Sequence, residues 1–454
     1  MSDTDGLPVP RRHWVMMCIL MGVILSSLDS AIVNIALPTI ARELSATDAA
    51  TVWVVNGYQL AAAVCLLPAA ALGEIFGIKR VYAFGMALFT ASSLGCALAP
   101  SLSVLVAARL AQGIGGACMS ALGPALIRDI YPRSILGSGF ALIALAVAMS
   151  GALGPTIAAL ILSVARWPWL FLVNLPVCVA ALPSFLALMP ASRRHMRAFD
   201  ILGALLSALT LGLVVVGVDT IGSGKISTAA AEIGIGLAGL GLLVWQQMHR
   251  AAPLLPLDLM GIPLFALSIV TSVCSYSAQI LAYVSLPFLF EVVMHRSQVA
   301  TGFLVTPWPL LVAVAAPVAG RLTARYPAAI LGSIGLAVLT AGLLLLIALP
   351  AAPADWDIGW RMSICGIGFG FFQTPNNMTL MTTGPASRSG AASGMVAVAR
   401  TLGWSLGSAL AALIFGLWGS RGTIVCLEVA AGFAAAGTLA SSARLGKPRP
   451  PSDP

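Results

Sequence analysis

The chain has 454 residues, of which 59% are hydrophobic and only 9% are charged. A soluble domain carries about 25% charged residues, so this composition excludes an ordinary soluble enzyme and a disordered chain. The formal net charge of +8 comes from basic residues that lie between apolar segments rather than in one basic stripe. We therefore expect no nucleic-acid partner, and we expect the lipid bilayer to act as the solvent of most of the surface.

Apolar segments of about 20 residues predict fourteen membrane-spanning helices, separated by polar or Gly- and Pro-rich breaks. The predicted spans are residues 14–38, 50–72, 80–98, 102–126, 136–160, 167–188, 199–219, 229–248, 262–290, 299–319, 327–349, 357–379, 390–417 and 421–442. The eight cysteines all fall inside apolar segments and none has CxxC spacing, so we interpret them as small core residues. The four histidines are scattered over segment ends, and we expect no metal site.

The positions of the basic residues predict how the spans are oriented. With a cytoplasmic N-terminus, the predicted cytoplasmic segments hold most of the 24 Lys and Arg residues. Short cytoplasmic loops of membrane proteins carry such an excess of Lys and Arg. Both termini are therefore predicted to be cytoplasmic, which requires an even number of spans.

The order of the spans predicts an all-α polytopic membrane protein with two six-helix bundles and an inserted two-helix hairpin. The expected units are an N-terminal bundle at 14–190, a basic loop and hairpin at 191–250, a C-terminal bundle at 251–442 and a cytoplasmic tail at 443–454. Paired bundles are typical of secondary transporters. A single polytopic bundle without internal symmetry is the alternative.

Asp29 is the charged residue that most needs an explanation, because a charge at the centre of a span costs at least about 2.5 kcal/mol. Ser26, Asp29, Ser30 and Asn34 follow one another at helical spacing and share one face of the first span. Such a face is expected to point at a water-filled cavity or at another helix. We interpret Asp29 as a carboxylate that binds a proton or a cation; an anchor for helix–helix hydrogen bonds is the alternative.

Three more charges fall within predicted spans at informative depths. Arg109 in the fourth span lies at a depth similar to that of Asp29, so the two residues are expected to pair or to share a proton pathway. A structural cation bonded to backbone carbonyls is the alternative for Arg109. Arg400 and Glu428, in the last two spans, also lie at compatible depths and are predicted to form a structural ion pair, with a coupling role as the alternative.

Further polar residues are expected to line a cavity. The second span contributes Trp53, Asn56, Tyr58 and Gln59, and a polar stripe in the ninth span contributes Ser275, Gln279 and Tyr283. In the fifth span, Gly151, Gly154 and Pro155 favour close helix packing and a bend, as expected of a helix that moves at a bundle interface.

Several of these segments together resemble the major facilitator superfamily, in particular its fourteen-span drug:proton antiporters, a group of multidrug and quaternary-ammonium exporters. The stretch Leu28–Pro38 (LDSAIVNIALP) is similar to the group's LDxTIVNxALP signature, with Ala31 at the Thr position. Trp53–Leu60 (WVVNGYQL) is typical of its second span.

The loop after the second predicted span resembles the superfamily's GxLxDRxGRKR loop. Glu74 stands at the Asp position, Gly77, Lys79 and Arg80 match, and Ala70 replaces the first Gly. The resemblance implies that these residues form a charge latch that steadies one conformation during gating.

Two more motifs complete the resemblance. The fourth span matches LxxxRxxQGxGA with Leu105, Arg109 and Gln112, which implies a role in proton coupling for Arg109. The fifth span, from Gly151 through Gly154 and Pro155, looks like the antiporter motif that is found mainly in exporters. The resemblance also implies a bacterial inner membrane, a monomer, and transport driven by the proton motive force without a cofactor.

The sequence thus predicts a proton-driven exporter that moves hydrophobic, cationic small molecules by alternating access. A proton-coupled exporter of a neutral or anionic metabolite or natural product is the alternative, and Arg109 and Arg400 would suit such a substrate. A membrane-embedded protein without transport activity is a third hypothesis. We expect no enzymatic activity, because the chain shows no clustered nucleophile, base or metal ligands.

Overall fold

The computed structural model describes residues 6–132, 136–190, 200–222, 225–249, 257–323, 325–350, 352–383 and 389–445, and the regular structure in these ranges is helical. The first helices are α1 (Arg11–Glu43), α2 (Asp48–Thr51), α3 (Trp53–Phe76), α4 (Ile78–Ala97), α5 (Leu102–Ile130), α6 (Leu136–Val164), α7 (Trp169–Leu172) and α8 (Asn174–Leu188). Helices α9 (Ile201–Gly222) and α10 (Ile226–Met248) follow and pack against each other.

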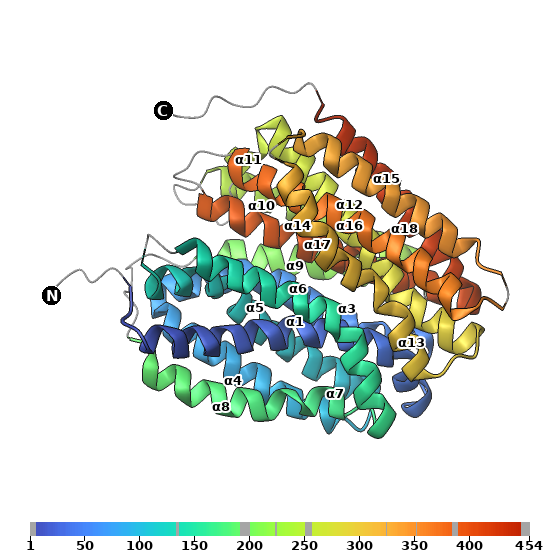
Figure 1. Ribbon diagram of the computed structural model, residues 1–454, viewed down its shortest axis with the longest axis horizontal. Helices are drawn as coiled ribbons and strands as arrows, with labels where there is room; N and C mark the ends of the chain where they lie inside the picture. Colours follow the sequence, from blue (N-terminus) through green and yellow to red (C-terminus); the bar gives the residue numbers. More distant parts are fainter. Residues whose placement is uncertain are drawn as a thin grey trace.

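The second half begins with α11 (Leu257–Met260), α12 (Pro263–Phe288) and a short π-helix, η2 (Leu289–Val293). It continues with α13 (Gln298–Val305), α14 (Pro307–Leu322), α15 (Ala328–Ile347), α16 (Asp355–Thr383), α17 (Ser389–Trp418), η4 (Gly419–Arg421) and α18 (Gly422–Ser442). In Figure 1 the helices from α1 to α8, in blue to green, form one group, and those from α12 to α18, in yellow to red, form a second group. Packing between α1 and α12, between α6 and α13, and between α3 and α17 joins the two groups.

Each predicted apolar segment overlaps one helix or two consecutive helices of the structure. Within the described ranges, eleven helical stretches are long and apolar enough to cross a membrane. The chain is therefore a multi-pass α-helical protein, while the count of fourteen spans stays a prediction. Several helices are longer than the apolar segments that predicted them: α1 continues through Pro38 to Glu43, because polar residues beyond the apolar core still continue the helix.

The two ends of the described chain lie at the same end of the helices. At the far end of α1, Arg42 meets Glu291 of η2, with 3.6 Å between the charged atoms. At the opposite end, Arg444 directly after α18 donates a 3.0 Å hydrogen bond to Ser268 near the start of α12. The start of α1 and the end of α18 therefore face the same way, as an even number of spans requires. The cytoplasmic location of this end remains a prediction.

Close glycine contacts repeat in the two halves. In the first half, a Cβ atom on Gly115 of α5 would lie 2.7 Å from the carbonyl oxygen of Gly85 in α4. In the second half, a Cβ atom on Gly368 of α16 would lie 2.7 Å from the carbonyl oxygen of Gly335 in α15. Both helix pairs approach so closely that only glycine fits, so the same packing device is used at corresponding places in the two halves.

Two glycines of α16 allow a matched test of this packing. We expect Gly368→Ala to lower the unfolding temperature in detergent, because overpacking against backbone atoms costs about 1–3 kcal/mol. A Cβ on Gly359 would meet nothing within 4 Å. We therefore expect Gly359→Ala to leave the unfolding temperature unchanged or to raise it, because alanine favours a helix by about 1 kcal/mol. Equal effects of the two substitutions would contradict the close approach of α15 and α16.

Candidate functional site

A buried polar network lies in the core of the first half, around Asp29 of α1. The Asp29 side chain is 0% exposed, and one carboxylate oxygen pairs with Arg109 of α5. The other oxygen accepts hydrogen bonds from the side-chain amides of Gln112 at 3.0 Å and Asn174 at 3.1 Å. The structure thus brings Asp29 and Arg109 together, and it surrounds the carboxylate with donors from α5 and α8.

The Arg109 guanidinium is held by four further contacts. It donates to the backbone carbonyl of Val54 at 2.9 Å and to the Gln112 side-chain oxygen at 2.6 Å. Its guanidinium carbon lies 4.4 Å from the ring centre of Tyr58 and 5.7 Å from that of Phe171. A charge pair that is stacked between aromatic rings and excluded from water interacts strongly, so removing either partner leaves an uncompensated charge.

Sequence analysis missed three members of this network: Gln112, Asn174 and Ser93. Ser93 of α4 accepts hydrogen bonds from Gln112 at 2.8 Å and from Asn174 at 3.3 Å, and so joins the two amides. Gln112 belongs to the fourth-span motif, one helical turn from Arg109, and could have been selected for that reason. Asn174 stands alone in an apolar segment, Ser93 follows Ser92 in another, and no spacing in the sequence connects either residue to Asp29.

The polar face of α1 packs against neighbouring helices. Ser26 donates to the backbone carbonyl of Val23 at 3.1 Å, and its own carbonyl accepts a 3.5 Å hydrogen bond from the Tyr58 hydroxyl. Asn34 is also buried. The side chain of Ser30 lies outside the described part of the chain. Of the two directions expected for this face, contact with other helices is the one the structure shows at Ser26 and Asp29.

The remaining candidates of the second span occupy the start of α3. Asn56 and Gln59 are buried, and Trp53 is half-buried. Neither polar atom of the Asn56 side chain has a hydrogen-bond partner among the described residues. Because α3 packs against both α5 and α17, Asn56 lies on a helix that is shared by the two halves.

In the second half, the predicted stripe on α12 is only partly directed at other helices. Ser275 donates to the carbonyl of Thr271 in its own helix at 2.6 Å. The Gln279 side-chain oxygen accepts a 3.3 Å hydrogen bond from the indole of Trp404 in α17. Tyr283 packs edge-on against Trp308, with 5.1 Å between ring centres.

The predicted ion pair between Arg400 and Glu428 is wrong. Glu428 is exposed on α18, whereas the guanidinium carbon of Arg400 lies 5.4 Å from the ring centre of Trp404, one turn along α17. The Nε atom of Arg400 is buried and has no hydrogen-bond partner in the described chain. Similar depths in two neighbouring helices did not ensure contact, because Glu428 is exposed on α18 whereas Arg400 lies against Trp404 of its own helix.

The loop predicted to act as a latch joins α3 to α4. Gly77 has a φ of +96°, a conformation that favours glycine and allows the sharp reversal between the two helices. Lys79 donates to the backbone carbonyl of Met189, and Arg80 is exposed. The side chain of Glu74 falls outside the described residues, so the proposed charge latch stays a prediction.

The segment predicted as an antiporter motif contacts both halves. A Cβ on Gly154 would lie 2.5 Å from the Cβ of Ala31 in α1, whereas a Cβ on Gly151 would meet nothing within 4 Å. The carbonyl of Pro155 lies beside Gly302 of α13, and the hydroxyls of Thr156 and Thr306 share a 2.9 Å hydrogen bond. This part of α6 therefore forms a close contact between the halves, near the end of the helices where Arg42 meets Glu291.

A second buried arginine, Arg444, was assigned to the cytoplasmic tail by sequence analysis. Its side chain is instead 2% exposed and donates to the Asn376 amide oxygen at 2.7 Å, in addition to Ser268. Burial lowers the pKa of Arg444 to about 10. The acceptors are neutral, so Arg444 joins the ends of α12, α16 and α18 without an ion pair.

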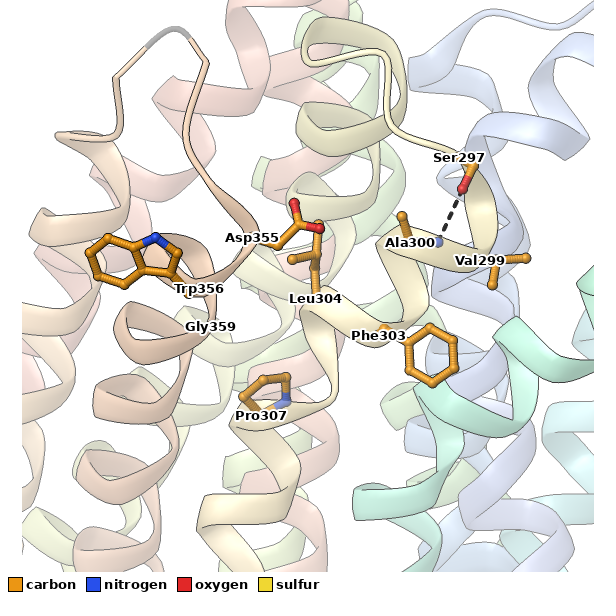
Figure 2. Close-up of a pocket in the computed structure, with 9 residues that line it drawn as sticks. All are labelled: Ser297, Val299, Ala300, Phe303, Leu304, Pro307, Asp355, Trp356 and Gly359. Carbon is orange, nitrogen blue, oxygen red and sulfur yellow. Dashed lines mark hydrogen bonds between the residues drawn. The ribbon is translucent and has the colours of Figure 1, made fainter.

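A pocket lies at the surface of the second half, and none of the site residues described above lines it. It has a volume of about 600 Å³ and lies between α13 and the start of α16. Figure 2 shows Phe303, Trp356 and Asp355 around it, with Ser297 accepting a hydrogen bond from the backbone of Ala300. Ser297 caps α13, and Asp355 also pairs with Arg296 at 3.1 Å. The pocket contains none of the predicted site residues.

Two helical halves with repeated packing, long apolar helices and a buried charge pair define a multi-pass membrane protein, and the comparisons with known proteins identify it as a transporter rather than an enzyme. A family model described as the Major Facilitator Superfamily matches residues 19–408. The chain therefore belongs to this superfamily, and the resemblance found in its sequence motifs is confirmed at that level.

Named relatives support the same class. The protein named "Uncharacterized transporter YebQ" of Escherichia coli K12 is 47% identical over 450 residues, which cover 98% of each chain. "Multidrug resistance protein Stp" of Mycobacterium tuberculosis CDC 1551 is 33% identical over 408 residues, or 88% of this chain and 75% of Stp. The crystal structure of a bacterial homolog of the human lysosomal transporter Spinster has the same fold, with a TM-score of 0.69 at 15% identity, over 98% of this chain and 100% of that one.

The amide donors to Asp29 can be tested separately from its charge. We expect Asn174→Leu to lower the unfolding temperature, because a buried carboxylate that loses a donor costs about 1–3 kcal/mol. Asn377→Leu serves as the control, because the Asn377 side-chain oxygen has no hydrogen-bond partner in the described chain. Thermal unfolding in the same detergent compares the two variants. An unchanged unfolding temperature for Asn174→Leu would show that this hydrogen bond is absent in the folded protein.

Proposed function

We propose that this protein is a proton-coupled exporter of hydrophobic small molecules in the inner membrane of a bacterium. It works by alternating access, with the two halves moving about a central site. Membership of the superfamily supports transport, and the relative named for multidrug resistance supports drugs as the exported compounds. The proton motive force supplies the energy, and the chain functions as a monomer without a cofactor.

The observation that carries the proposal is the buried Asp29–Arg109 pair. The Asp29 carboxylate is 0% exposed and is bound by an arginine and two amides. Burying such a charge pair within a membrane costs desolvation free energy, so its presence needs an explanation. Such a pair has two states: with a charged carboxylate the guanidinium is neutralised, and with a protonated carboxylate it is left uncompensated. Arrival and loss of one proton therefore changes the forces between α1 and α5.

The position of the pair connects this change to the movement of the halves. Helix α1 contacts α12 and α13 of the second half, in addition to α5 and α8 of its own half. A change in how α1 packs against α5 thus reaches the interface between the halves directly. Only a difference in proton affinity between the two conformations can make this coupling drive transport.

The structure changes which substrate charge we favour. The sequence predicted that Asp29 binds a cationic substrate, but in the structure the Asp29 carboxylate is already paired with Arg109. A cation would have to displace a buried guanidinium and leave its charge unpaired, which costs several kcal/mol. We therefore favour the alternative, a neutral or anionic hydrophobic substrate. Export of cations, the expectation from the sequence motifs, is the second candidate.

Proton coupling is tested with Asp29→Asn in inverted membrane vesicles. The vesicles are energised to an acid interior, and a pH-sensitive dye reports proton release when lipophilic anions, neutral compounds or cations are added. We expect the wild type to respond and Asp29→Asn to give no response. Asparagine can still accept hydrogen bonds from Gln112 and Asn174, but it cannot carry a proton.

Asp357→Asn is the matched control for this experiment. Asp357 also pairs with an arginine, Arg361, at 3.1 Å, but it lies in the first turn of α16 in the second half. We expect this variant to keep the wild-type response. Full substrate-dependent proton release by Asp29→Asn would contradict the coupling role, and would leave membership of the transporter family unaffected.

A further inference from the structure

Arg400 differs from three other arginines, Arg109, Arg361 and Arg444, in how its guanidinium is held. Arg109 is paired with Asp29, and Arg361 is paired with Asp357 in its own helix. Arg444 is held by hydroxyl and amide acceptors. For Arg400, the structure shows no hydrogen bond or ion pair to any residue that it describes, and its Nε atom is buried. Arg109, Arg361 and Arg444 are thus each bonded to acceptors, whereas Arg400 has no acceptor among the residues that the structure describes.

Arg400 lies on the face of α17 that contacts α12. Gly403 and Gly407 of α17 approach the backbone of α12 at Val273 and Ser277. Arg400 precedes Gly407 by seven residues, which is two helical turns, so the two residues lie along the same face. The side chain is therefore directed toward the inner helix α12 rather than toward lipid, and it is partly exposed there.

Aromatic and amide groups of three helices are connected to Arg400 through Trp404. The guanidinium of Arg400 stacks on Trp404, whose indole donates to Gln279 of α12. Tyr276 of α12 packs edge-on against Trp404, with 6.0 Å between ring centres, and its hydroxyl accepts a 3.2 Å hydrogen bond from Gln373 of α16. We call Arg400, Trp404, Tyr276, Gln279 and Gln373 the Arg400 cluster.

The chemistry of the Arg400 cluster suits a flat anion. A guanidinium binds a carboxylate with two parallel hydrogen bonds, and stacking on an indole fixes its plane in advance. The aromatic rings offer apolar surface to the rest of such a molecule. A cation would instead meet an unneutralised positive charge at the same place.

We propose that the Arg400 cluster binds the anionic group of the transported substrate, and that this substrate is a hydrophobic aromatic anion with a carboxylate or phenolate. The inference rests on the proposed transport function and adds the substrate class to it. The ligand then supplies the counter-charge that an arginine within a membrane helix requires, in place of an acceptor that the described residues do not offer.

Two dyes with the same xanthene ring but opposite charge provide the test. Fluorescein is an anion with a carboxylate and a phenolate, and rhodamine 6G is a cation. Their binding to the purified full-length protein in lipid nanodiscs is measured by fluorescence polarisation. We expect fluorescein to bind the wild type, and we expect Arg400→Gln to weaken this binding by about tenfold or more, the effect of losing one charge-assisted hydrogen-bonded pair. Binding of rhodamine 6G should not weaken in this variant.

Arg361→Gln is the control, because it removes an arginine from the same half outside the Arg400 cluster. We expect it to keep wild-type affinity for fluorescein. If Arg400→Gln does not fold, Arg400→Lys and Trp404→Phe replace it: the lysine retains the charge without the planar fork, and the phenylalanine retains a ring without the bond to Gln279. Each should weaken fluorescein binding by several-fold.

The proposal is overturned if fluorescein does not bind the wild type, or if it binds equally well to the Arg400 variants. This measurement does not depend on protons, so it separates the two proposals. Arg400-dependent binding without proton release in vesicles would support the Arg400 cluster and overturn the coupling. Proton release that depends on Asp29 but not on Arg400 would support the coupling and overturn the substrate class.

Discussion

The need to bury charge without water is the constraint on which the rest of this structure depends. In the first half the problem is solved by Asp29 and Arg109, which neutralise each other inside the core. The solution requires four helices to meet at one place, because the donors and the linking hydroxyl come from α4, α5 and α8 while the carboxylate comes from α1. One network thus joins four helices of the half, and in the proposed function its carboxylate is the group that gains and loses the proton.

The two halves share a packing plan but differ in polar content. Gly113 of α5 and Gly366 of α16 contact the carbonyls of Tyr58 and Trp308 in the same way. The residue four positions before the glycine is Arg109 in the first half and Met362 in the second. The residue immediately before the glycine is Gln112 in the first half and Cys365 in the second. All four side chains are buried, so the second half fills with apolar groups the positions that carry the charge network in the first half.

In the proposed function, this asymmetry separates proton coupling from substrate binding. The Asp29–Arg109 pair is isolated from water and involves α1, which contacts the other half. Arg400 lies in the other half, where it stacks on Trp404 and has no ion-pair partner in the described part of the chain. A neutralised charge can respond to a proton, and an uncompensated one can attract a ligand, so each half offers one of the two properties that exchange requires.

The amino-acid sequence by itself determined that the chain spans a membrane, where its helices lie along the chain, and that Asp29 and Arg109 sit at similar depths. These properties follow from composition and helical periodicity, which act locally. The tertiary structure decided which side chains meet: Ser93 and Asn174 join Asp29, Glu428 does not join Arg400, and Arg444 leaves the expected tail for a buried position. The reason is geometric, because sequence gives the depth of a residue in a helix but not the rotation of that helix against its neighbours. The sequence shows that a charge within a span costs free energy, so a compensating group is expected. Which residue supplies that group depends on helices that are distant in the chain.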